Sequence, residues 1–235
     1  IQITGAGIYL PDKIEKSKST AQLINKSEDW IISKTGVKER RISEIDVDQM
    51  GAIAAAEALN NKDEPDLIIN ASGVPKQTIP DTSVFFQREL GIKSVPCFSI
   101  HGTCLSFLIA LNNARALINS NIYKKILIIS SDRGSIGRNP NEPESAALLG
   151  DGAAAILVEK EDTSTNSFHY WKMNTWSSDA ELTEVRGGGT FKHPLDKNTE
   201  LNDNLFTMDG PAIYKSARKK AYKMVLDTFK KTNFN

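Results

Sequence analysis

Short apolar runs rich in Ile, Leu and Val alternate along this chain with segments of helical periodicity, and this alternation constrains the fold most. Strands are predicted at residues 1–8, 67–72, 96–100, 125–131 and 153–158. Helices are predicted between them, at residues 19–24, 47–59, 82–90 and 104–119. Strands that are apolar at nearly every position must be covered on both faces, so the pattern predicts a layered α/β fold.

The sequence changes character after Lys160. Residues 161–206 are mostly polar and include three consecutive glycines at 187–189, which predicts long loops. Apolar residues at helical spacing then predict a last helix at about 211–231. We therefore divide the chain into an N-terminal half, 1–160, and a region 161–235 that holds a linker and the first helix of a C-terminal half. We expect a fragment of a longer protein, because no further strand follows this helix.

The composition excludes several functional classes. Lys+Arg and Asp+Glu both number 29, and this zero formal net charge argues against a general nucleic-acid binder. No apolar run approaches the roughly 20 residues that cross a bilayer, and the first residues do not resemble a signal peptide. Two cysteines give no disulfide framework and fit a reducing compartment. We expect a cytoplasmic protein with neither a nucleic-acid nor a membrane partner.

Cys104 is the strongest candidate for a catalytic residue. It follows an apolar run, 95–100, and a three-residue break, and it opens the apolar segment that predicts a helix. Unpaired backbone N–H groups and the positive end of a helix dipole favour a thiolate, which a nucleophilic cysteine needs. The alternative is a small core residue, since free cysteine is often buried. Cys97, in the middle of a strand, is predicted to be buried and inert.

No metal site and no cofactor are predicted. The sequence has no cluster of Cys and His at metal-ligand spacing, and Gly5-Ala6-Gly7 lacks the third glycine and downstream acid of a dinucleotide site. His101 lies three residues before Cys104, which permits a Cys–His pair, although an ordinary packing role is the commoner outcome. His169 and His193 lie in loop-like stretches and are predicted to be exposed.

Four strings stand out along the chain: residues 29–40 (DWIISKTGVKER), 103–107 (TCLSF), 150–155 (GDGAAA) and, more weakly, 208–215 (MDGPAIYK). In this order they resemble the motifs of the β-ketoacyl-acyl-carrier-protein synthase III family of the thiolase-like fold. The resemblance implies a thiolase-like layered fold, α/β/α/β/α when complete, with its first half and the start of its second present. It also implies that Cys104 takes an acyl group from a coenzyme A or carrier-protein thioester. A malonyl-carrier thioester then loses CO2, and its carbanion attacks the acyl-enzyme.

The same resemblance implies roles for further residues. Trp30 would stack on the adenine of coenzyme A, Lys34 would pair with a phosphate, and Tyr214 would line the pantetheine channel. Ile79 and Phe107 would shape the acyl pocket, with Ile79 reaching into the partner subunit of a homodimer. The alternatives are packing residues for Trp30, Tyr214 and Ile79, and a solvated charge for Lys34. No cofactor is implied beyond acyl-coenzyme A or acyl carrier protein as substrates.

The sequence also departs from the family pattern. The decarboxylating His and Asn of the family lie far beyond residue 235, so this chain alone is expected to lack that part of the active site. Residues 139–145 carry two acids and two prolines where initiating members often have an Arg, which makes carrier-protein docking more secure than binding of free coenzyme A. Leu105-Ser106 replaces the small pair common after the cysteine. Two other functions stay open: an acyltransferase that passes the acyl group to an alcohol or amine, and a non-catalytic scaffold subunit.

Overall fold

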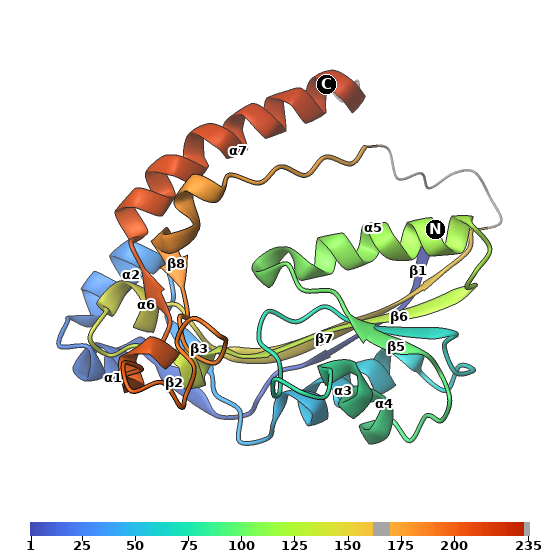
Figure 1. The fold of residues 1–235 in the computed structure, drawn as a ribbon, viewed down its shortest axis with the longest axis horizontal. Coiled ribbons are helices and arrows are strands. Elements are labelled where there is room, and N and C mark those ends of the chain that lie inside the picture. The colour runs from blue at the N-terminus through green and yellow to red at the C-terminus, as the bar shows by residue number, and fades with distance from the viewer. Residues whose placement is uncertain (162–169, 233–235) are drawn as a thin grey trace. The chain divides into compact units, whose positions relative to one another are not determined.

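The computed structural model describes residues 1–161 and 170–232, and it has the predicted α/β fold (Figure 1). The described residues form two compact units. The first contains Ile1–Ile14, Arg41–Ser135 and the segment from Gly150, and the second contains Glu15–Arg40, Ile136–Leu149 and the described residues from Tyr170. The division expected at residue 160 stays a prediction.

The first unit is built on a five-stranded mixed sheet. Its strand order is β1 (Gln2–Tyr9), β7 (Asp151–Glu159), β6 (Lys125–Arg133), β4 (Leu67–Asn70) and β5 (Cys97–Ser99). β4 runs parallel to both β5 and β6, whereas β7 is antiparallel to β6 and β1. All five predicted strands are confirmed. Every residue of β4 is buried, as expected for a strand in the interior of a covered sheet.

Helices cover both faces of this sheet (Figure 1). α3 (Val47–Leu59) and α4 (Thr82–Glu89) pack on one face, in a core that includes Met50 and Phe86. α5 (Ser106–Asn119) packs on the other, in a core that includes Ala110 and Ile118. The predicted helix at 104–119 begins differently from expectation, because residues Thr103–Leu105 form the 3-10 turn η1 and the α-helix starts at Ser106.

Two local features fix the position of α3. Its first turn is closed by a capping box in which Asp46 and Gln49 each accept a backbone N–H of the other's segment. β1 lies against this helix through Gly7, where a Cβ atom would lie 2.1 Å from the carbonyl oxygen of Ala54. Only glycine allows so close an approach of strand and helix.

Cys97 corrects one expectation. Its side chain is half-buried rather than buried, because β5 lies at the edge of the sheet and only one neighbour, β4, shields it. Part of the residue packs against the core on the α3 side.

The second unit has fewer residues in helices and strands than the first. It contains α1 (Ser17–Leu23), α2 (Glu28–Thr35), α6 (Pro143–Ala146), α7 (Gly210–Thr232) and the strand pair β8 (Thr183–Glu184) and β9 (Thr207–Met208). It also contains the 3-10 turns η3 (Ser177–Leu182) and η4 (Leu201–Asn204). The strand pair β2 (Ile14–Lys16) and β3 (Glu39–Arg41) and the 3-10 turn η2 (Gly134–Gly137) each include residues of both units.

The core of the second unit joins α1, α2 and α6. Its buried apolar residues are Ala21, Ile24, Ile31, Ala146 and Ala147. The guanidinium of Arg40 is buried beside them, where it donates hydrogen bonds to the carbonyl oxygen of Ala147 and to the hydroxyls of Ser17 and Thr20. Its partners offset the cost of burying a charge. The segments 15–40 and 136–149 are thereby held together.

The described residues contain neither a membrane-spanning helix nor a metal-binding cluster. None of the helices within residues 1–161 and 170–232 is long and apolar enough to cross a bilayer. Over the same ranges, no group of three or more His, Cys, Asp and Glu side chains is placed to hold a metal ion.

Candidate active site

Cys104 lies in the connection from β5 to α5, in the middle of the turn η1, and its side chain is exposed. We call residues 101–106 the Cys104 turn. Thr103, just before the cysteine, has φ of 50°, a left-handed conformation that is uncommon for a β-branched residue. Its hydroxyl donates to the carbonyl oxygen of Gly102 at 2.8 Å. The sharp reversal therefore places the thiol on the surface at the start of a packed helix.

Ser106 closes this turn from the inside. Its side chain is buried, and its Oγ accepts the backbone N–H of Gly102 at 2.9 Å. The same Oγ lies 2.7 Å from the carbonyl oxygen of Thr103 and 3.3 Å from that of Ser72. Sequence reasoning missed this role and noted only that the residue differs from the family pattern. A serine in the first turn of the helix predicted at 104–119 was the available signal.

Asp132, near the carboxyl end of β6, lies in the same region. Its Oδ1 accepts the backbone N–H groups of Gly73 and Val74, each at 2.8 Å. Burial raises the pKa of the Asp132 carboxyl, and these two hydrogen bonds and the charge of His101 oppose that rise. Nothing in the sequence singled out this residue, because its contacts depend on which strands are neighbours.

Two of the three histidines lie within the described residues. His101 is exposed, and no hydrogen bond joins it to Cys104 among the described residues. His193 is exposed, as predicted, and its Nδ1 accepts the backbone N–H of Leu195 at 3.2 Å. His169 lies outside the described residues.

The two residues expected in the acyl pocket lie in the first unit with Cys104. Ile79 precedes a cis peptide bond to Pro80, and its side chain is 81% exposed. Phe107 is half-buried in α5 and packs against the core on that face of the sheet. Phe107 follows Ser106 directly, so the turn and this ring share one rigid helix start.

Trp30 and Lys34, expected at coenzyme A, both belong to α2 in the second unit. Trp30 is half-buried against the core of this unit, and its backbone N–H is capped by Ser27 Oγ at 3.0 Å. The Nζ of Lys26 lies 5.5 Å from the centre of its ring. Lys34 is exposed in the last turn of α2.

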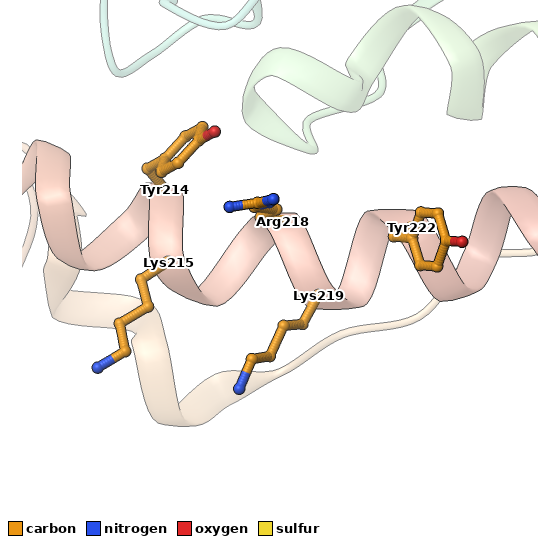
Figure 2. Close-up of a pocket in the computed structure, with 5 residues that line it drawn as sticks. All are labelled: Tyr214, Lys215, Arg218, Lys219 and Tyr222. Carbon is orange, nitrogen blue, oxygen red and sulfur yellow. The ribbon is translucent and has the colours of Figure 1, made fainter.

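Tyr214 belongs to a group of two tyrosines and three basic residues on α7, which we call the α7 basic face: Tyr214, Lys215, Arg218, Lys219 and Tyr222. Figure 2 shows Tyr214 projecting from one side of the helix and Lys215 and Lys219 from the other; with Arg218 and Tyr222 they line a hollow. Both tyrosines are 67% exposed. Across its whole length α7 carries seven Lys and Arg residues against one acid, Asp227. Such a face suits an anionic ligand or partner.

Comparisons with known proteins agree with one another. A model of the 3-oxoacyl-[acyl-carrier-protein (ACP)] synthase III family matches residues 98–176. The β-ketoacyl-[acyl-carrier-protein] synthase III of Chlamydia pneumoniae is 30% identical over 222 residues, which cover 92% of this chain and 66% of that protein. The corresponding synthase III 1 of Vibrio cholerae is 30% identical over 242 residues, covering 100% of this chain and 73% of that protein.

A solved structure is also similar over the whole chain. The crystal structure of 3-oxoacyl-[acyl-carrier-protein] synthase III from Aquifex aeolicus VF5 aligns with a TM-score of 0.86 and 28% sequence identity. The alignment covers 100% of this chain and 72% of that one. The chain thus spans 66% of the length of the chlamydial relative and somewhat more of the others.

Proposed function

Because this chain belongs to the β-ketoacyl-[acyl-carrier-protein] synthase III family, we propose that Cys104 takes an acyl group from a thioester. The thiolate of Cys104 attacks the thioester carbonyl, a new carbon–sulfur bond forms, and the carbon–sulfur bond to the donor breaks. The donor leaves as a thiolate and takes up a proton. The observation that carries the proposal is the exposed thiol in the turn η1, immediately before α5.

The start of α5 supports this step chemically. Backbone N–H groups at the first turn of a helix have no partner within the helix, and the helix dipole is positive there. Both stabilise negative charge, first on sulfur and then on the oxygen of the tetrahedral intermediate. Ser106 and Thr103 hold the turn, so the donors need little rearrangement when charge develops.

We propose that the acyl-enzyme then condenses with a malonyl-carrier thioester. Loss of CO2 leaves a carbanion, which attacks the acyl carbonyl and releases the thiolate of Cys104. The names of the relatives, β-ketoacyl-[acyl-carrier-protein] synthases, support this second step and an acyl carrier protein as partner. The product would be a β-ketoacyl thioester, as in the synthesis of fatty acids.

The second unit supports an anionic donor. Coenzyme A and carrier protein both present their thioester on a phosphate-bearing pantetheine arm, and the α7 basic face offers Lys215, Arg218 and Lys219. We propose that Tyr214 lines the channel for this arm, that Trp30 stacks on the adenine, and that Lys34 pairs with a phosphate. A homodimer, with Ile79 at its contact, completes the proposal; the 81% exposed Ile79 side chain is available for it.

Intact mass after incubation with acyl-coenzyme A or acyl carrier protein tests the first step. We expect one acyl adduct on the parent protein and on Cys97→Ala, and none on Cys104→Ser. An unmodified parent protein, or an adduct that persists in Cys104→Ser, would contradict the assignment of the nucleophile.

A second assay separates condensation from its alternatives. The acylated protein is given malonyl-carrier thioester, and CO2 release is followed together with the loss of the acyl adduct. Release of CO2 with formation of a β-ketoacyl product supports condensation. Loss of the adduct only when an alcohol or amine is added would indicate an acyltransferase instead, and a protein that is never acylated would fit a scaffold subunit.

A further inference from the structure

Asp132 and the Cys104 turn lie at the same end of the sheet, at the carboxyl ends of β4, β5 and β6. β4 pairs in parallel with β5 and with β6, so the segments that follow these strands emerge side by side. The segment after β5 is the Cys104 turn, the segment after β4 contains Gly73 and Val74, and β6 carries Asp132 near its end.

The Asp132 carboxylate anchors the segment between them. One oxygen, Oδ1, accepts two consecutive backbone N–H groups, those of Gly73 and Val74, each at 2.8 Å. A carboxylate that accepts two such bonds fixes the direction of both peptide planes. The anchored residues form the short connection that follows β4.

Gly73 lies between Asp132 and the peptide bond that leads into Cys104. A Cβ atom built on Gly73 would lie 3.4 Å from Asp132 Oδ1 and 3.8 Å from the carbonyl carbon and oxygen of Thr103. An added Cβ would make ordinary van der Waals contact with both groups, so Gly73 faces the Thr103–Cys104 peptide with room for about one methyl group between them. The anchored loop therefore lies next to the turn that carries the nucleophile.

A second contact joins the loop to the turn. The carbonyl oxygen of Ser72, next to Gly73, lies 3.3 Å from the Oγ of Ser106. Ser106 in turn accepts the backbone N–H of Gly102 and lies 2.7 Å from the carbonyl oxygen of Thr103. The loop thus meets the Cys104 turn at Thr103 and at Ser106, on both sides of the cysteine.

We propose that Asp132 is a positioning residue for Cys104, which acts by holding the Gly73–Val74 loop against the Cys104 turn. The proposal rests on the acyl transfer proposed above, and it adds that the position of the thiol depends on a carboxylate of β6, which β4 separates from β5 in the sheet. Asp132 acts as a hydrogen-bond acceptor and takes no proton from the thiol. Loss of the acceptor leaves the N–H groups of Gly73 and Val74, one part-buried and one exposed, without their protein partner and frees the loop to move away from Thr103.

The chain offers a matched control. Asp66 also accepts two consecutive backbone N–H groups with one carboxylate oxygen, those of Lys124 at 2.8 Å and Lys125 at 2.9 Å. Asp66 precedes β4, whereas the Gly73–Val74 loop follows β4. Asp66 therefore lies at the opposite end of the strands from Cys104. Asp66→Ala therefore removes the same kind of anchor away from the nucleophile.

The test compares Asp132→Ala, Asp132→Asn and Asp66→Ala in a Cys97→Ala background. Acylation of Cys104 by an acyl thioester is timed by intact mass, and hydrogen–deuterium exchange is followed in peptides that cover residues 101–106 and 122–126. We expect Asp132→Ala to acylate at least tenfold more slowly and to exchange faster at 101–106. Asp132→Asn keeps an acceptor oxygen and should stay within threefold of the parent rate. Asp66→Ala should exchange faster only at 122–126.

The outcomes separate this proposal from the proposed function. Unchanged exchange at 101–106 in Asp132→Ala overturns the positioning role, whatever the acylation rate. An equal loss of rate in Asp132→Asn overturns the hydrogen-bond role. If the parent protein is not acylated at all, the proposed function fails, and exchange at 101–106 still decides whether Asp132 holds the turn. Thermal melting of each variant shows whether it is folded at the assay temperature.

Discussion

Thr103 and Ser106 set the backbone that presents Cys104. Thr103 adopts a left-handed conformation, φ 50°, which costs on the order of 1–3 kcal/mol for a residue other than glycine. The cost is tolerated because the buried Ser106 hydroxyl binds both Gly102 and Thr103. A single hydroxyl therefore balances a strained residue next to the thiol.

Replacing this hydroxyl tests the balance. We expect Ser106→Ala to lower the free energy of unfolding by about 1–2 kcal/mol, since it leaves the part-buried N–H of Gly102 without its acceptor. Chemical denaturation measures the change. Ser120→Ala is the control, because Ser120 makes a similar bond, to the carbonyl oxygen of Leu117 at 2.9 Å, on an exposed site at the far end of α5. Equal losses in the two variants would contradict a special role of Ser106.

At the scale of whole elements, Glu15 of β2 links this strand to the segment after η2. Its carboxylate accepts Arg138 Nη1 at 2.5 Å and Nη2 at 3.2 Å, and the hydroxyl of Thr20 at 2.7 Å. The hydrogen bonds from Arg138 are the main cause that lowers the pKa of Glu15 below its ordinary value, against the opposing effect of burial. The carboxylate is only partly exposed, so solvent does not fully screen the pair.

The lowered pKa predicts a pH dependence of stability. A carboxyl group with a lower pKa in the folded state contributes stability above its unfolded pKa, ordinarily 4.5, and this contribution is lost as the pH falls through the folded value. We expect Glu15→Gln to lose about 0.5–1 kcal/mol at pH 7 and less below pH 4, as measured by urea denaturation across this range. Glu44→Gln, which removes an exposed pair with Lys13, should change little at either pH. A constant difference between Glu15→Gln and parent at all pH values would refute the linkage.

How far the elements could be predicted depends on how local their causes are. α3 was predicted to the residue because its cap at Asp46 and its alanine-rich face lie within one segment. α2 was missed as a helix because Trp30, Ile31 and Ile32 are adjacent rather than spaced at a helical period. Cys104 could be found from its place between an apolar strand and an apolar helix. Asp132 could not, since its role follows from the order of β4, β5 and β6 in the sheet.

On the scale of the whole molecule, the structural match confirms the expected thiolase-like fold. The charges are distributed unevenly over this fold. The formal net charge of the chain is zero, yet α7 carries seven basic residues against one acid. A balanced total therefore conceals a locally positive surface, which net charge alone could not reveal. Long-range attraction of an acidic or phosphate-bearing partner depends on this local field rather than on the sum.

The basic residues of α7 should strengthen binding of a charged acyl donor. The double variant Lys215→Gln/Lys219→Gln should raise KM for an acyl carrier protein about five- to tenfold at low salt, and the difference should shrink toward 0.5 M salt as the charges are screened. Acylation by an uncharged acyl-N-acetylcysteamine thioester should be unchanged, because it brings no phosphate to α7. Steady-state kinetics with both donors measure the two effects.

A matched variant lies at the other end of the same helix. Lys230 and Lys231 are exposed in the last turn of α7, outside the hollow lined by Tyr214 and Tyr222. Lys230→Gln/Lys231→Gln removes the same charge from the same helix and should leave KM for the carrier protein within twofold of the parent value. If both double variants weaken the carrier equally, net charge and not the α7 basic face governs the encounter. If neither does, the partner docks elsewhere, and α7 has no part in receiving the acyl donor.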